Sequence, residues 1–273
     1  MTDDLAVYGF ACSGLLFVLL VLLETVFPRK KRSMARSGRW RTNIIIILIG
    51  TVAVRLMGPV VAISAAVFAA HNDFGLFNWT SLPGWLEFAL ALILLDLALY
   101  LQHLMTHKIA LLWAVHKVHH ADRDIDVTTG VRFHPIEIIL SMLYKCALVL
   151  LLGPSPLAVF AFALILNLCA MFNHSNLSLP EPIDAILRRL LVTPDMHRVH
   201  HSTVTEETNS NFGFSIALWD RLFGTYRAQP IAGHDDMVIG LPEYQSEHPA
   251  ELWWSLVLPF ADPHKKKRFS DRR

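Results

Sequence analysis

The sequence has few cysteines and few charged residues, and these shortages exclude several classes of protein. Only three of 273 residues are cysteine, at Cys12, Cys146 and Cys169, and no C-x-x-C pair occurs. The chain therefore encodes neither a redox dithiol nor an iron–sulfur centre. No G-x-G-x-x-G nucleotide fingerprint is present, and the net charge is only +1. Nucleic-acid binding is therefore unsupported, since it calls for a strongly basic surface.

Apolar residues are abundant, and they point to the membrane. Hydrophobic residues make up 53% of the chain and charged residues 17%, which is too apolar for an ordinary soluble domain. Residues 5–27 form an almost unbroken apolar run, long enough at about 1.5 Å per residue to cross a core of about 30 Å. A signal peptide would instead begin with basic residues, whereas Asp3 and Asp4 come first here. The run is therefore predicted to be a transmembrane helix.

A basic stretch at 29–41 sets the expected topology, because Lys and Arg favour the cytoplasmic side. Residues 43–70 should then run outward and residues 86–105 should return. The apolar region 136–172 is interrupted by Gly-Pro-Ser-Pro and is predicted to form a helical hairpin, crossing fully or dipping in and returning. The more polar residues 175–273 should form a cytoplasmic cap, with a solvated basic run at 265–268. The predicted fold class is all-α: a polytopic membrane helical bundle with a cytoplasmic, histidine-rich di-metal cap.

Histidines are concentrated in one part of the chain, where ten of the fourteen lie between residues 103 and 201. Residues three and four apart share one face of a helix, so each tight cluster aims its imidazoles at one point. A single H-x-x-x-H is weak evidence, but H-x-x-H-H occurs twice and favours ligation. Imidazole suits iron, zinc, copper or nickel, whereas calcium and magnesium need oxygen ligands. Eight nitrogens suffice for two metal ions; they come from His103, His107, His116, His119, His120, His197, His200 and His201.

A series of motifs between residues 96 and 227 resembles the fatty acid hydroxylase superfamily, the sterol desaturase-like membrane di-iron oxygenases. The motifs are D-x-x-x-Y-x-x-H-x-x-x-H at 96–107, H-x-x-H-H at 116–120, F-H-P-x-E at 133–137, N-H-S-N at 173–176, T-P-x-x-H-x-x-H-H at 193–201, N-x-N-F-G at 209–213 and W-D-R-L-F-G-T-Y at 219–226. The resemblance implies N-terminal transmembrane helices with a basic cytoplasmic loop in residues 1–83, a catalytic domain in 84–227 and a cytoplasmic tail in 228–273.

The resemblance also implies a cofactor and a ligand set. Two iron ions would use O2 as co-substrate to oxidise an unactivated C–H bond of a membrane lipid, with electrons from an external reductase or electron carrier. Zinc could replace iron in purified protein, because it binds imidazole more tightly. Some relatives carry another histidine where this chain has Ala170, so a tenth ligand could be recruited, and His134 is the candidate. The implied metal ligands are His103, His107, His116, His119, His120, His174, His197, His200 and His201.

Three further side chains are candidates for catalytic or supporting roles. Asp96 shares the helix face of His103 and is expected to orient a ligand histidine or border the substrate channel, since an acid inside a membrane helix is costly unless it is used. Asp195 precedes His197 and could orient it or favour a helix start. His134 could equally be structural, because His-Pro is a helix-start pattern. Other expectations are that Glu137 bonds a histidine, that Asp220 and Arg221 pair, and that His71, His234, His248 and His264 are surface or loop residues.

The residues leave the reaction and the setting open. Lipid hydroxylation is favoured; desaturation or ether-lipid monooxygenation would use the same ligands, and a non-enzymatic membrane metal-binding protein is a distant alternative. That last alternative predicts ligands along a path across the bilayer, whereas these should gather at one face. A sterol, fatty acyl chain, carotenoid or alkylglycerol would each suit an apolar cavity. A bacterial inner membrane is favoured over the endoplasmic reticulum, and no oligomeric state is indicated.

Overall fold

The computed structural model describes residues 2–261, and helices are the regular structure throughout that range. The predicted all-α class is confirmed. The basic run 265–268 and His264 lie outside the described residues, as does the end of the expected tail. The longer helices are α1 (Thr2–Val26), α2 (Arg36–Leu56), α3 (Ala62–His71), α4 (Gly84–Lys108), α5 (Ala110–His120), α6 (Pro135–Leu152) and α7 (Pro156–His174). Shorter ones come after them: α8 (Glu181–Leu187), α9 (Pro194–His200), α10 (Thr205–Thr208), α11 (Leu218–Leu222), α12 (Gly233–Asp236) and α13 (Leu252–Val257), with 3-10 turns at Thr129–Val131, Pro242–Tyr244, His248–Ala250 and Leu258–Phe260.

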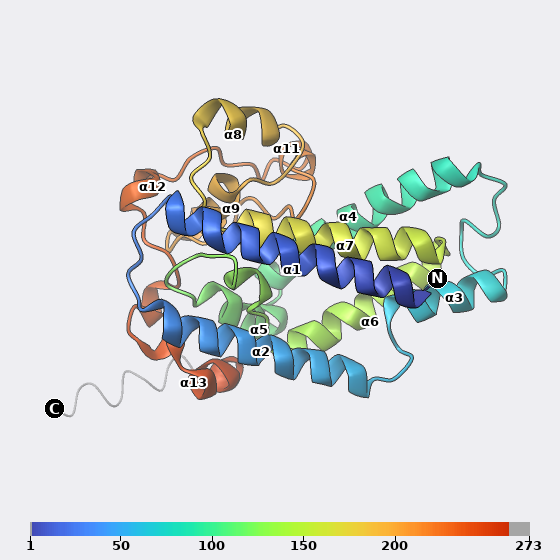
Figure 1. Cartoon of the computed structure of the whole chain (residues 1–273), viewed down its shortest axis with the longest axis horizontal. Coiled ribbons are helices and arrows are strands. Elements are labelled where there is room, and N and C mark those ends of the chain that lie inside the picture. The colour runs from blue at the N-terminus through green and yellow to red at the C-terminus, as the bar shows by residue number, and fades with distance from the viewer. Residues whose placement is uncertain (1, 262–273) are drawn as a thin grey trace.

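Four of these helices are long and apolar enough to cross a membrane: the Val7–Val26 part of α1, and α4, α6 and α7. They run along the length of the molecule, with α1 packed against α7 (Figure 1). Large apolar side chains such as Phe10, 84% exposed, remain uncovered on them. Such surface is unfavourable in water but suits a hydrocarbon environment. The protein is therefore a multi-pass membrane protein.

The predicted outward crossing at 43–70 is wrong as a single helix. The chain leaves α2 at Leu56, turns at Gly58, where φ is +63°, and resumes as α3 at Ala62. Glycine adopts this left-handed conformation without strain, and the proline after it cannot continue a helix. With arginines at both ends, α2 is not among the four candidate spans.

The helical hairpin predicted from 136–172 is confirmed. Gly153, at φ +63°, ends α6 and donates its N–H to Val149 O. Ser155 then caps α7 by accepting from the N–H of Ala158, and Pro156 occupies the first helical position. The hairpin returns the chain to the end of the molecule where α9 lies, and α3 lies at the opposite end (Figure 1).

A buried ionic network fixes the segment after α5. The guanidinium of Arg39 in α2 contacts Asp122 at 2.6 Å and Asp126 at 2.7 Å, and all three side chains are at most 1% exposed. Arg132 is fully buried nearby and donates to Asn43 Oδ1 and to the hydroxyl of Ser255. Buried ions require such pairing because they have lost water. Parts of the chain on both sides of residues 84–227 therefore hold the region between the histidine clusters.

Candidate metal centre

Nine histidines from four helices and their ends meet at one end of the bundle. They form two groups, within each of which one ring nitrogen per residue lies within 4.8 Å of the others. Helices α4 and α5 supply the N-terminal members, α7 ends at His174, and α9 with its C-terminal residue supplies the rest. The first group is His103, His107, His116, His120 and His200; the second is His119, His174, His197 and His201. These are the nine residues predicted as ligands, and ligation itself stays a prediction.

The unpaired ring nitrogens fit metal ions. Eight of the nine histidines carry a buried ring nitrogen without a hydrogen-bond partner, His174 being the exception. Leaving so many buried polar atoms unpaired is costly unless something else binds them. His174 Nε2 lies 3.1 Å from His119 Nε2 and 3.0 Å from His197 Nε2. Two ligands at right angles on one ion would be about 3 Å apart, given metal–nitrogen bonds of about 2.1 Å.

The outward-facing nitrogens of several rings are held by the protein. His103 Nδ1 contacts Phe212 O at 2.8 Å, and His200 Nδ1 contacts Ser210 O at 2.7 Å. A carbonyl can only accept, so each of these rings carries its proton on Nδ1 and presents an unprotonated Nε2 inward. His174 Nδ1 likewise donates to Ala170 O at 2.7 Å. Metal-binding histidines are typically oriented in this way.

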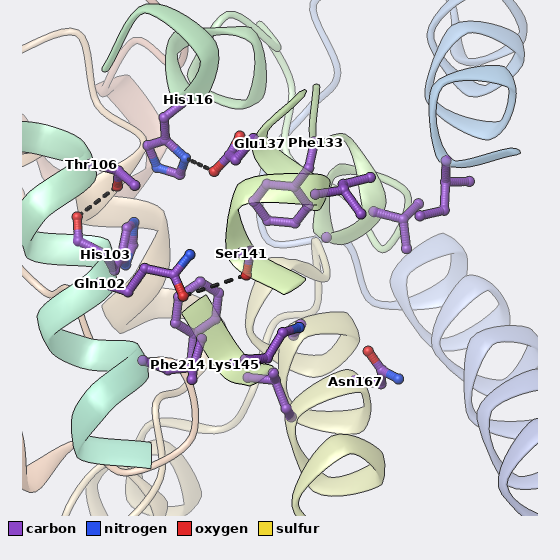
Figure 2. Close-up of a pocket in the computed structure, with 17 residues that line it drawn as sticks. Gln102, His103, Thr106, His116, Phe133, Glu137, Ser141, Lys145, Asn167 and Phe214 are labelled. Atoms are coloured by element: carbon purple, nitrogen blue, oxygen red, sulfur yellow. Dashed lines mark hydrogen bonds and ion pairs between the residues drawn. The ribbon is translucent and has the colours of Figure 1, made fainter. Parts of the chain in front are cut away.

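The expected contact between Glu137 and a histidine is present. Glu137 Oε1 lies 2.6 Å from His116 Nδ1, which joins the first turn of α6 to α5 (Figure 2). A carboxylate in this position orients the imidazole and makes it a stronger ligand. The neighbouring ring of Phe133 stacks on His119, with centroids 4.4 Å apart, so the start of α6 packs on two of the histidines.

Asp220 braces the loop that supplies two of the carbonyls, a role that was not predicted from the sequence. Its carboxylate accepts from the N–H groups of Phe212, at 2.7 Å, and Gly213, at 2.9 Å. A side chain at Gly213 would meet Asp220 Oδ2 at 2.8 Å, which explains the glycine. The predicted Asp220–Arg221 pair is not formed; the Arg221 guanidinium instead lies over the ring of Tyr226, 4.1 Å from its centroid. The signal available in the sequence was the motif N-x-N-F-G.

Burial keeps five of these histidines neutral. Burial lowers the pKa of His119, His120 and His197 well below the ordinary value, and neighbouring imidazoles lower it further. The pKa values of His200 and His201 are lowered in the same direction, again mainly by burial. Neutral imidazole is the form that binds a metal ion. These five histidines therefore offer ligands without first having to lose protons.

Asp96 bonds to the segment 216–219 and not to a histidine. Its Oδ2 accepts from Trp219 Nε1 at 2.8 Å and from the N–H of Ile216 at 3.2 Å. Asp96 is 4% exposed. Its two hydrogen bonds tie α4 to the cap. No hydrogen bond to a histidine is made by Asp96 in the described structure, so the expected orienting contact is absent.

His134 and Asp195, each at the start of a helix, contact backbone and arginine groups rather than the histidine rings of the two groups. His134 caps α6, with Nδ1 accepting from the N–H of Ile136 at 3.3 Å, and it belongs to neither histidine group. Asp195 lies in the first turn of α9, pairs with Arg198 and contacts Arg29 at 3.2 Å. It thereby fastens α9 to the loop after α1.

The prediction that His234 is a surface or loop histidine is wrong with respect to exposure. It lies in α12, is 5% exposed and has Nε2 3.5 Å from Asp195 Oδ2. Burial lowers the pKa of His234 to about 4, and the nearby Arg198 and Arg29 oppose its protonation although Asp195 favours it. His71 and His248 are exposed, as predicted.

A cavity of about 210 Å³ reaches the histidines from inside the bundle. We call it the histidine chamber, because His103 and His116 form part of its wall (Figure 2). Apolar side chains such as Leu99, Leu166 and Phe214 line most of the rest. Its position places any apolar occupant beside the first histidine group.

Comparison with known proteins places these features in a family. The model of the fatty acid hydroxylase family matches residues 88–225, about half of the chain. Ornithine lipid hydroxylase OlsE of Rhizobium tropici is 28% identical over 235 residues, which are 81% of this chain and 67% of that protein. Human alkylglycerol monooxygenase is 30% identical over 174 residues, 62% of this chain and 36% of that enzyme. Mouse cholesterol 25-hydroxylase is 27% identical over 145 residues, 52% of this chain and 47% of that enzyme.

The chain thus spans two thirds of the first relative and less than half of the other two. No solved structure matches it. The family match covers the helices and loops that supply the nine histidines. The chain belongs to the fatty acid hydroxylase family.

Proposed function

We propose that this protein is a membrane-bound di-iron oxygenase that hydroxylates an unactivated C–H bond of a lipid, using O2 and electrons from an external reductase or electron carrier. The observation that carries this proposal is the pair of buried histidine groups beside an apolar chamber. An unactivated C–H bond offers no acid, base or leaving group, so its oxidation needs redox chemistry from a cofactor. Two bound irons would supply electrons to activate O2.

The protein's own residues bind, orient and shield. The nine histidines would hold the ions, and the carbonyls of Ser210 and Phe212 and the carboxylate of Glu137 would keep the rings in place. Apolar walls would position the lipid beside His103 and His116 and exclude water from the reaction. We propose residues 84–227 as the catalytic domain, 1–83 as N-terminal helices and 228–273 as a cytoplasmic tail, with both flanks bracing the domain.

The proposed orientation puts the site on the cytoplasmic side. Arg29, in the basic loop after α1, reaches Asp195 in α9, so the loop and the histidines occupy the same end of the bundle. The positive-inside rule makes that end cytoplasmic, where an electron donor would dock. A bacterial inner membrane is the proposed location, because the ornithine lipid hydroxylase among the relatives is bacterial.

Hydroxylation, desaturation and ether cleavage share the removal of one hydrogen and differ in the later steps. A desaturase removes a second hydrogen, and hydroxylation beside an ether oxygen gives a hemiacetal that falls apart. The alkylglycerol monooxygenase relative makes ether-lipid oxidation the second candidate. A non-enzymatic metal carrier would need ligands along a path through the bilayer, and the histidines instead share one end.

The test is metal content together with product analysis. Protein purified anaerobically after growth on iron-57 should hold two irons per chain, with the Mössbauer spectrum of a coupled pair. Expression in a host lacking the gene should add a hydroxylated or cleaved lipid. One metal ion or none after iron reconstitution would contradict the di-iron proposal. Zinc in aerobically prepared protein would not, since zinc displaces ferrous iron from imidazole sites.

A further inference from the structure

Lys145 lies near the middle of α6, inside a candidate membrane span, and lines the histidine chamber (Figure 2). A charged side chain in such a segment is costly and usually serves a function. Among the side chains described, those of residues 7–261, no carboxylate forms an ion pair with Lys145 and no hydrogen bond is made by its amino group. The amino group thus has no partner among the described side chains, and the cavity that Lys145 lines has room for a ligand that could supply one.

Thr106 and Glu137 line the chamber near the histidines and are bonded to His103 O and His116 there. Three further polar side chains of the same chamber come from three helices. They are Gln102 of α4, Ser141 of α6 and Asn167 of α7, and Ser141 Oγ donates to Gln102 Oε1 at 3.4 Å. Figure 2 shows Lys145 between Ser141 and Asn167, on the far side of the chamber from His116. A hydrocarbon alone would give these groups nothing to bond. The chamber therefore fits a ligand that carries a polar group as well as an apolar part.

A second cavity places Lys145 at a junction. This deep chamber has a volume of about 240 Å³ and shares Lys145, Leu166 and Asn167 with the histidine chamber. Its other walls are apolar residues of α3, α4, α6 and α7, such as Leu95 and Phe162. A lipid lying through both chambers would pass its polar group by Lys145, with hydrocarbon in the deep chamber and another part beside the histidines.

We propose that Lys145, assisted by Asn167, binds the acidic group of the lipid substrate, a carboxylate or a phosphate, and so places a neighbouring carbon beside His103 and His116. This subsite rests on the proposed lipid oxidation, because it assigns the substrate class of that site. An acidic group would neutralise the lysine, and the resulting ion pair is far cheaper within the bundle than either charge alone. The substrates would then be acidic lipids rather than neutral sterols or alcohols.

The test is a binding comparison that needs no turnover. Metal-loaded protein in a neutral detergent is titrated with palmitate, hexadecyl phosphate and the neutral 1-hexadecanol. The wild type should bind at least one acidic probe more tightly than the alcohol, and which one distinguishes a carboxylate from a phosphate. Lys145→Met should weaken binding of that probe about tenfold, the effect of losing one charge-assisted hydrogen bond. Binding of the alcohol should change little.

Matched variants separate charge from fold. Lys145→Arg should keep the preference for the acidic probe. Asn167→Asp should lose it, because a carboxylate beside Lys145 competes with the ligand. Lys31→Met removes an exposed lysine outside both chambers and should leave all three affinities unchanged. Metal content, measured in each variant, reports whether the site is intact.

The results that would refute the acidic-lipid subsite at Lys145 differ from those that would refute the proposed lipid oxidation. Equal or absent binding of acid and alcohol by the wild type, or an unchanged preference in Lys145→Met, would remove the subsite even if lipids are oxidised. Loss of the preference in Lys145→Met would support the subsite even if no oxidation is found, and the proposed function would then fail alone.

Discussion

Glu137 Oε1 lies 2.6 Å from His116 Nδ1, and this contact joins a membrane-spanning helix to a histidine helix. Glu137→Gln keeps the shape but removes the charge that makes the imidazole a stronger ligand. Loss of such a supporting group typically costs tenfold to a hundredfold in metal affinity or activity. We expect a fall in that range in iron affinity, measured by competition with a chelator. The exposed Glu181→Gln is the control, and equal affinity in the two variants would refute the role.

The two histidine groups should both be needed. His119→Ala removes a member of the second group and His200→Ala a member of the first. Each should lower metal content and abolish lipid oxidation. His248, which is exposed and contacts Glu251, serves as the control, and its alanine variant should do neither. Full activity of His119→Ala would contradict the assignment of that group.

Asp122, which is buried and paired with Arg39, should contribute strongly to the stability of the folded protein. Asp122→Ala leaves Arg39 fully buried with Asp126 as its remaining carboxylate partner. Breaking a buried ion pair costs about 3 kcal/mol or more, so the melting temperature in detergent should fall by several degrees. Arg123→Met removes the 3.7 Å contact with the exposed Glu247 and an exposed hydrogen bond to Ser246 O at 3.1 Å, each of which contributes about 1 kcal/mol or less. Similar melting temperatures for both variants would argue against the network.

The contact between Asp96 and Trp219 can be separated from a role at the metal by a double-mutant cycle. Asp96→Asn and Trp219→Phe should each destabilise the protein, and the double variant should lose less than the sum, with a coupling of about 1 kcal/mol. Iron content should stay near that of the wild type in all three. An iron deficit confined to Asp96→Asn would restore the original expectation that Asp96 orients a histidine.

His234 should make stability depend on pH. Its pKa of about 4 in the folded protein lies below the ordinary value of 6.5, so the unfolded chain binds more protons between these values. The stabilisation is thus present above about pH 6.5 and is lost as the pH falls toward 4. In melting curves from pH 7 to pH 5, the wild type should lose stability relative to His234→Gln. Parallel curves would mean that His234 does not titrate in this range.

The features that could be predicted from the sequence are those that depend on local spacing. Apolar runs predicted the spans, and Gly153 with its prolines predicted the hairpin turn. Helical spacing grouped eight histidines, but His174 was added only by resemblance, because it stands alone in the sequence. The turn after α2 was missed although Gly58 and Pro59 signal it, since the apolar residues on both sides suggested one continuous helix.

Contacts between distant segments could not be read from spacing. Arg39 and Asp122 are 83 residues apart, and no periodic pattern connects them. Asp220 was missed for another reason: its partners are only seven and eight residues away, but they are backbone N–H groups of an irregular loop, which no side-chain pattern marks. Asp96 was expected near the histidines because it shares a helix face with His103, but its partner Trp219 comes from the cap. His234 lies in a short helix whose burial depends on the packing of α9.

The carbonyls that hold His103 and His200 belong to a loop braced by Asp220, and Thr225 donates to the carboxylate of Asp220. A ribosome makes the chain from its amino end, so the site remains incomplete until residue 225 has emerged. All four candidate spans end at or before His174 and have been synthesised by then. Insertion of the helices can therefore precede assembly of the site, and any metal ions would be taken up at a separate, later stage of the protein's maturation.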